Sequence, residues 1–123
     1  MYIPPITEKL QLSVANSYYA LGVDQTGEFI ENIEFDLQVS LESGNLYYSI
    51  ELWFKNAYDG TSVKDIKVGE VSGDIAGGSV NTHNIKYIDR IHYLAGDYDV
   101  KFPLTAKITV NGKIEERTIT IWK

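Results

Sequence analysis

Three carboxylates, Glu34, Asp36 and Glu51, have the residue types and spacing that could do chemistry. They take polar positions in two apolar–polar alternating segments, and a hairpin through the connection 42–45 would place Asp36 opposite Glu51. Like charges facing each other across a ladder cost stability, so a basic protein or a hard cation such as Ca²⁺ would stabilise this acidic face. A glycosidase also needs a carboxylate pair, but a strand face of a small domain offers it no cleft. We therefore expect either solvated charge or an acidic binding face here, without catalysis.

A second set, Asp74, Ser79 and His83, has the residue types of a hydrolase triad. All three fall in the glycine-rich segment 72–84, which is typical of a long, mobile loop. A triad needs rigid elements that hold its members within hydrogen-bond reach. The other histidine, His92, is isolated, and the chain has no cysteine to supply a thiolate. The sequence thus predicts no enzyme activity, no catalytic residue, no metal and no cofactor.

Outward aromatic side chains form the third candidate. Tyr47 and Trp53 take polar positions of their segment, and Trp122 takes an outward position near the end of the chain. Flat exposed rings stack on sugars or anchor protein partners. The alternative is that a loop, a terminus or another strand covers them.

The elements that must position these residues are read from alternation with a period of two. Apolar residues alternate over 33–41 and again over 46–54, on either side of the turn sequence Glu42-Ser43-Gly44-Asn45. A four-residue hairpin loop would pair Leu41 with Leu46 and Ile33 with Phe54, and every such pair would be apolar on one face. The sequence therefore predicts a hairpin over 33–54.

A second hairpin is predicted over 98–122. Asn111-Gly112 suits a type I′ turn, because both residues tolerate the positive φ that this turn requires. A two-residue loop pairs Leu104 with Ile119 in the core.

The same register brings Glu115 and Arg117 onto the apolar side of this hairpin. Either a bulge shifts the register or the tip projects past the core, and we favour the projecting tip. A projecting, charge-edged tip would be a candidate arm for assembly.

Before the first hairpin, the sequence predicts an edge strand over 6–14 and a short strand over 18–23 with a turn at 24–27. After it, the sequence predicts a loop over 56–61, a strand over 63–71 and the loop 72–84. The segment 85–93 fits both strand and helix spacing, and we interpret it as a strand.

The sequence Leu94-Ala95-Gly96-Asp97-Tyr98 resembles the tyrosine corner of immunoglobulin-like and fibronectin type III domains. The resemblance implies an all-β fold, an antiparallel two-sheet sandwich of seven or eight strands in one domain over 1–123. It also implies that Tyr98 bonds back to the loop and that Leu94 closes the bottom of the core. The chain departs from antibody domains in lacking a cysteine pair and in placing Trp53 on a polar side. The family mainly binds and assembles, which is an analogy and not an activity.

The composition of the chain limits which classes of partner it could bind. A net charge of −6 argues against nucleic-acid binding, and no apolar run reaches membrane-spanning length. The start Met-Tyr-Ile-Pro-Pro lacks a signal peptide, so we expect cytoplasmic synthesis, with association with a virion as one destination. A secreted origin follows only if the chain is a module cut from a larger protein.

The leading hypothesis is a non-catalytic binding or assembly module, such as a phage or bacterial structural component that docks a protein, a second copy of itself or a glycan. One alternative is a small acidic inhibitor or immunity-type protein of the cytosol. The other is a small-ligand carrier with a closed β-barrel.

Overall fold

The computed structural model describes residues 10–123, which form eight antiparallel β-strands and no helix. The strands are β1 (Leu10–Val23), β2 (Glu28–Leu41), β3 (Asn45–Tyr58), β4 (Val63–Ala76), β5 (Val80–Tyr87), β6 (Ile91–Tyr93), β7 (Lys101–Val110) and β8 (Lys113–Trp122). The predicted all-β, antiparallel fold is confirmed. Within the described part of the chain, no helix is long and apolar enough to cross a membrane.

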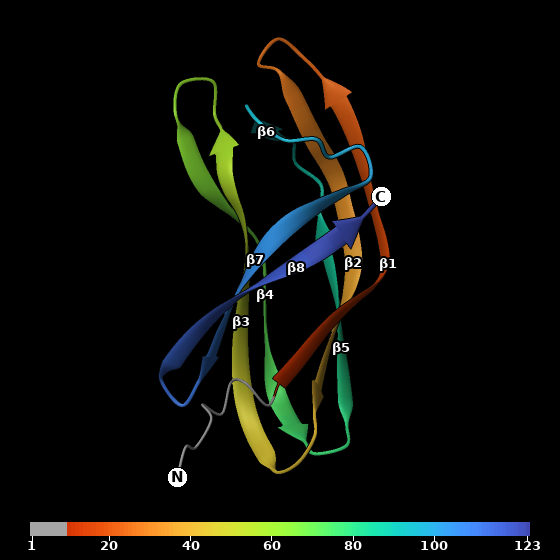
Figure 1. Cartoon of the computed structure of the whole chain (residues 1–123), viewed down its shortest axis with the longest axis vertical. Coiled ribbons are helices and arrows are strands. Elements are labelled where there is room, and N and C mark those ends of the chain that lie inside the picture. Colours follow the sequence, from red (N-terminus) through yellow and green to blue (C-terminus); the bar gives the residue numbers. More distant parts are fainter. Residues whose placement is uncertain (1–9) are drawn as a thin grey trace.

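All eight strands belong to one hydrogen-bonded system, which runs β1-β2-β6-β3-β7-β8 with β5 added on β2 and β4 added on β3. The short strand β6 joins the two halves, because it pairs with Phe29 and Ile30 of β2 and with Ala57 and Tyr58 of β3. Figure 1 shows β6 between the tips of two long hairpins, β1–β2 and β3–β4. Strands β1 and β8 meet at the other side, where the Trp122 amide donates to Ser17 Oγ at 3.2 Å. The arrangement is thus nearly closed and barrel-like, and it does not divide clearly into the two sheets expected.

The core fills the space that these strands enclose. Alternate side chains of β2, β3 and β7 point inward and are almost fully buried, among them Phe35, Leu37, Ile50, Leu52, Leu104 and Ile108. The predicted inward faces of all three segments are therefore correct.

The hairpin β7–β8 has the predicted register, with Leu104 opposite Ile119 and a turn at Asn111-Gly112. Asn111 and Gly112 have φ values of 51° and 77°, as a type I′ turn requires.

The tip of this hairpin differs from the expectation. The register continues without a bulge up to the turn. Ile108 and Val110 are buried on its inner side, and Arg117 donates a hydrogen bond to the carbonyl of Leu10 and pairs with Glu115. The prediction that the tip projects past the core is wrong for this inner face, because its side chains are buried and Arg117 is bonded to the start of β1.

The predicted hairpin between 33–41 and 46–54 does not form. β2 pairs with β1, β5 and β6, whereas β3 pairs with β4, β6 and β7, so the connection 42–44 crosses from one half of the molecule to the other. Alternation with a period of two identifies which face of a strand is buried. It does not identify the strand's neighbour, because two strands with apolar faces bury them equally well when they are paired in one sheet and when they face each other across a core. The prediction failed on the partner and not on the face.

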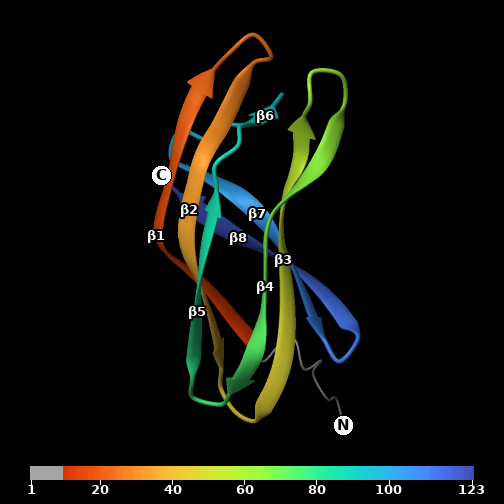
Figure 2. The ribbon, with the colours of Figure 1, turned by 180° about the vertical axis from the view of Figure 1, so that it is seen from behind.

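The predicted loop over 72–84 is also wrong, because β4 extends to Ala76 and β5 begins at Val80. Figure 2 shows the two strands joined by a short turn at one end of the molecule. The glycines allow close packing: a Cβ on Gly69 would lie 3.1 Å from Ile85 Cγ2, and one on Gly73 would lie 3.2 Å from the Tyr48 hydroxyl. These residues thus make room for neighbours, and their presence does not indicate a mobile loop.

Other boundaries shift by less. The predicted strands 6–14 and 18–23 are one strand, β1, with register shifts near Asn16; residues 6–9 lie outside the described part. The turn at 24–27 is confirmed by reciprocal backbone hydrogen bonds between Asp24 and Gly27. Strand β3 continues through 56–58, so the predicted loop over 56–61 begins later, after Tyr58. The segment 85–93 is extended, as predicted, and is interrupted after Tyr87.

The segment before β7 follows the tyrosine-corner expectation only in part. Tyr98 Oη lies 3.5 Å from the carbonyl oxygen of Ala95, the outer limit of a hydrogen bond. Leu94 is 67% exposed and does not close the core. The alternating strand also begins later than predicted, because Val100 is 62% exposed and β7 starts at Lys101.

Candidate binding surfaces

The outward side chains of β4, β3, β7 and β8 include Tyr47, Trp53 and Trp122, which together we call the aromatic face. Cross-strand pairing places Tyr47 beside Asp74 of β4, and Trp53 between Lys67 of β4 and Thr105 of β7. Tyr47 is 57% exposed and Trp122 is 49% exposed. Trp53 is half-buried, so the structure places all three predicted aromatic residues on the outward side of one continuous run of strands, with only Tyr47 and Trp122 well exposed.

Polar neighbours fix the rings of both tryptophans. Trp53 Nε1 donates to Glu51 Oε1 at 3.3 Å, and the Lys107 ammonium lies 5.6 Å from the ring centroid. The Lys101 ammonium lies 4.9 Å from the centroid of Trp122. A cation over an aromatic face is attracted by the quadrupole of the ring, so each lysine favours the observed orientation of its tryptophan.

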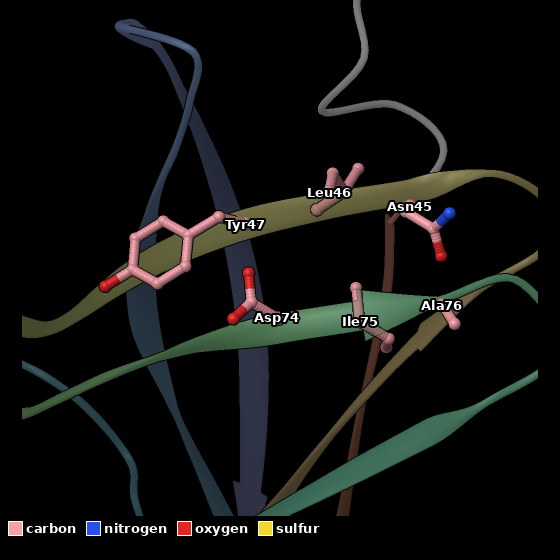
Figure 3. A pocket seen from close by; sticks show the side chains of 6 residues that line it. All are labelled: Asn45, Leu46, Tyr47, Asp74, Ile75 and Ala76. Carbon is pink, nitrogen blue, oxygen red and sulfur yellow. The ribbon is translucent and has the colours of Figure 1, made fainter.

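Tyr47 also borders a shallow groove of about 400 Å³ at one end of β3 and β4. Figure 3 shows the Tyr47 ring and the Asp74 carboxylate side by side along the two strands, with Asn45 further along. A ring, a carboxylate and an amide in one depression give a partner both an apolar surface and hydrogen-bonding groups.

The acidic set is not assembled as predicted. Asp36 is paired with Ala15 and Asn84, whereas Glu51 is paired with Glu70 and Lys107 in the other half of the molecule. The opposition of Asp36 and Glu51 was wrong because it depended on the hairpin that does not form. Glu51 still faces a like charge, that of Glu70. The Lys67 ammonium lies between them, 3.9 Å from Glu51 and 3.0 Å from Glu70. Glu34 of the predicted acidic face lies opposite Lys86.

Asp74, Ser79 and His83 do not come together as a catalytic triad. His83 points inward, and its Nε2 lies 2.5 Å from the hydroxyl of buried Tyr48. Asp74 is on the outer surface beside Tyr47, and Ser79 is in the turn before β5. Among residues 10–123, no group of three His, Cys, Asp or Glu side chains is placed to hold a metal ion.

The second histidine belongs to a charged network at the tip of the β1–β2 hairpin. His92 Nε2 lies 2.8 Å from both carboxylate oxygens of Asp24, and Arg90 reaches Asp24 at 3.1 Å and Glu31 at 3.3 Å. The bond from His92 and the turn amides of Thr26 and Gly27 lower the pKa of Asp24 to about 2. The network fastens β6 to the turn of the hairpin.

Sequence reasoning missed a polar cluster on the outer side of β1, β2 and β5. The Nδ2 atoms of Asn16 and Asn84 donate to the two oxygens of Asp36 at 2.9 and 3.0 Å. These bonds, that from Asn16 first, lower the pKa of Asp36. The available signal was a run of amides and hydroxyls at the outward positions of all three segments: Ser13, Asn16, Asn32, Gln38, Ser40, Thr82 and Asn84.

Comparison with known proteins assigns no family, since no family model and no curated protein matches the chain. Among solved structures, the chain is similar to DesR, a β-glucosidase from Streptomyces venezuelae crystallised in complex with D-glucose. The identity is 12% and the TM-score 0.34, over 92% of this chain and 15% of the enzyme chain. A likeness at this level carries no argument about function.

Proposed function

We propose that the chain is a non-catalytic binding and assembly module of immunoglobulin-like type, which docks a protein partner through the aromatic face. The observation that carries the proposal is the position of the tryptophans. The sequence has only two, and both lie on the outside of the same run of strands.

This placement is informative because the core has large aromatic side chains of its own. Tyr19, Tyr48, Phe35, Phe54 and Phe102 are all almost fully buried. Leaving Trp122 half in water forgoes part of the stabilisation that burial of a large apolar side chain gives. Tryptophan and tyrosine are enriched among the residues that dominate binding energy at protein interfaces.

Further outward residues suit an interface of this kind. The face adds Pro103 and the 67% exposed Ile114, and the β-branched Thr105, Thr109 and Thr118 take outward positions on β7 and β8. Its charges include internal pairs such as Glu51 with Lys67, so the face presents little net charge to a partner. In support of the two-layer type, β5, β2 and β1 adjoin on one side, and β4, β3, β7 and β8 adjoin on the other.

The test is quantitative capture of partners from the native host, with parent, Trp53→Ala and Trp122→Ala as baits. We expect the partner recovered in stoichiometric amount by the parent to be reduced at least about tenfold with either variant, since interface tryptophans often contribute more than 2 kcal/mol. The matched control is Tyr18→Ala, which removes an equally exposed ring from the outer side of β1.

Sedimentation of the purified protein identifies a second copy as the partner, if it dimerises and Trp53→Ala abolishes the dimer. Equal capture by the parent and both tryptophan variants, with all proteins folded, would rule out the aromatic face.

A further inference from the structure

The polar cluster around Asp36 lies on a face that the proposed function does not use. On the outer side of β1, β2 and β5, successive cross-strand rows place Ser13 beside Gln38 and Thr82, and Asp36 beside Asn84. The next row places Tyr18 beside Glu34 and Lys86. We call these residues, with Asn16 and Asn32, the amide face.

Two bulges shape this face. Register shifts flank the pair Tyr18–Glu34, one at Asn16 of β1 and one at Asn32 of β2. Both asparagines have left-handed backbone conformations, with φ values of 53° and 55°. Such a conformation is uncommon for a residue other than glycine, and bulges re-aim side chains in this way beside binding sites. The bulge at Asn32 thus places its side chain beside Tyr18 in one depression, and the bulge at Asn16 lets its amide reach Asp36.

The chemistry of Asp36 fixes how its neighbours point. An ionised carboxylate only accepts hydrogen bonds, so Asn16 and Asn84 must both turn their amide nitrogens toward it. Each asparagine then has a carbonyl oxygen and one remaining N–H directed away from Asp36. The result is an ordered set of acceptors and donors on a rigid sheet, which is the arrangement that binds hydroxyl groups best.

A depression of about 200 Å³ adjoins this set, lined by Tyr18, Asn32, Glu34, Lys86 and Ile88. Tyr18 is 55% exposed and Ile88 is 65% exposed, so an aromatic and an aliphatic surface are open to a ligand. Glu34 and Lys86 are cross-strand partners of opposite charge, and both oxygens of Asp36 are occupied by amides. The depression itself therefore has balanced charges, and the one remaining charge beside it, that of Asp36, disfavours an anion and is already hydrogen-bonded by two amides.

We propose that the amide face is a binding site for a neutral oligosaccharide. One sugar ring stacks on Tyr18 in the depression, with its hydroxyls bonded to Asn32, Glu34 and Lys86. The next ring lies over Asp36, where the outward carbonyl and N–H groups of Asn16 and Asn84 accept from and donate to its hydroxyls. Each sugar hydroxyl can both donate and accept a hydrogen bond, whereas a protein surface would leave several of these polar groups unpaired.

The test uses an array of immobilised neutral, acidic and basic oligosaccharides, followed by calorimetric titration of the tightest neutral binder. We expect Tyr18→Ala and Asn84→Ala each to weaken binding about tenfold, the effect of losing one stacking or bidentate contact. Val63→Ala is the control, because it trims an apolar side chain of similar exposure, 52%, that has no part in either proposed binding surface.

Three results would overturn the proposal: no binding of any neutral oligosaccharide at about 1 mM, binding of acidic or basic ones alone, or unchanged binding by both amide-face variants. The denaturant midpoints of the variants show that they are folded. The site stands apart from the protein-docking proposal, because Tyr18→Ala and Trp53→Ala affect different faces and are tested by different assays.

Discussion

Gly96 lies where the chain folds back against its own aromatic ring. A Cβ at this position would lie 2.3 Å from Cζ of Tyr98, and its φ of 148° is one that other residues rarely adopt. The Tyr98 ring in turn contacts Tyr93, with the ring centroids 4.7 Å apart. A single glycine thus allows the segment before β7 to close on the core.

We expect Gly96→Ala to destabilise the fold by about 2–4 kcal/mol, since it combines backbone strain with overpacking. Chemical denaturation measures this. Gly112→Ala is the control, because its φ of 77° brings strain but no atom lies within 4 Å of the added methyl group. We expect that variant to lose about 1 kcal/mol, and an equal loss in both would refute the role of the Tyr98 contact.

Asp24 gives the stability a defined dependence on pH. Its pKa is lowered to about 2 in the folded protein, chiefly by the bond from His92, against about 3.9 in an unfolded chain. A lowered carboxyl pKa stabilises the fold above pH ~4, and this contribution is lost as the pH falls through 2. We expect Asp24→Asn to be less stable at pH 7 and to have a flatter stability profile between about pH 4 and 2.

Urea unfolding across this pH range checks the prediction for Asp24. The exposed carboxylate Glu42 offers a control in Glu42→Gln, which should follow the parent curve. If the stability of Asp24→Asn changed with pH in parallel with that of the parent, the Asp24 carboxylate would contribute nothing to the pH dependence.

At the scale of elements, the two connections that cross between the halves of the molecule support each other. The Gly77 amide donates to the carbonyl of Gly44 at 2.6 Å, and the Gly78 amide donates to that of Leu41 at 2.8 Å. A Cβ on Gly77 would lie 2.5 Å from Cα of Ser43. Backbone therefore packs on backbone here, with no side chain that could move aside.

We expect Gly77→Ala to cost about 1–3 kcal/mol and to speed hydrogen exchange of the Gly78 amide, because the two connections must separate. Gly44→Ala is the comparison, since its φ of 85° brings backbone strain but its added methyl group meets nothing within 4 Å and leaves the two connections in contact. Unchanged exchange at Gly78 in Gly77→Ala would contradict the mutual support.

These elements also show what could be predicted from the sequence. Alternation identified the inward faces of β2, β3 and β7, and a two-residue turn identified the partner of β7, because Asn111-Gly112 leaves the chain no other return path. The connection after Leu41 is long enough either to make a hairpin or to cross the core, and no local signal distinguishes these. Long-range pairing decides between them.

The candidate sites divide in the same way. The outward position of Trp53 and Trp122 depends only on alternation within one strand and was predicted correctly. The opposition of Asp36 and Glu51 depended on a pairing partner and was wrong. The cluster of Asp36 with Asn16 also requires a bulge in β1, which the sequence signals only as a break in alternation.

At the scale of the whole molecule, the two proposed faces point outward from opposite halves of the strand system. The aromatic face has internally paired charges, and most of the net charge of −6 falls on the other half, where the segments 10–42 and 80–93 carry seven acidic and two basic residues. Binding through the aromatic face should therefore depend mainly on apolar contact.

We expect the affinity for the protein partner to change by less than about tenfold between 50 and 500 mM salt. Titration of the purified complex at several salt concentrations measures this. A steep loss of affinity with salt would instead favour an acidic surface that binds a basic partner, as in an inhibitor or immunity-type protein.

The pairing of β3 with β7 carries a consequence for how the chain reaches this structure. Ser49 pairs in register with Thr109, so strands far apart in sequence must find each other before the core can close. The β7–β8 hairpin can form within about 10 μs, but closing long loops has an entropic cost that later contacts must offset. Refolding is therefore expected on the scale of milliseconds to seconds, as is usual for all-β domains with mostly non-local pairing. Until β7 docks, the edge of β3 is open to other chains, so this step is where the protein is most exposed to aggregation.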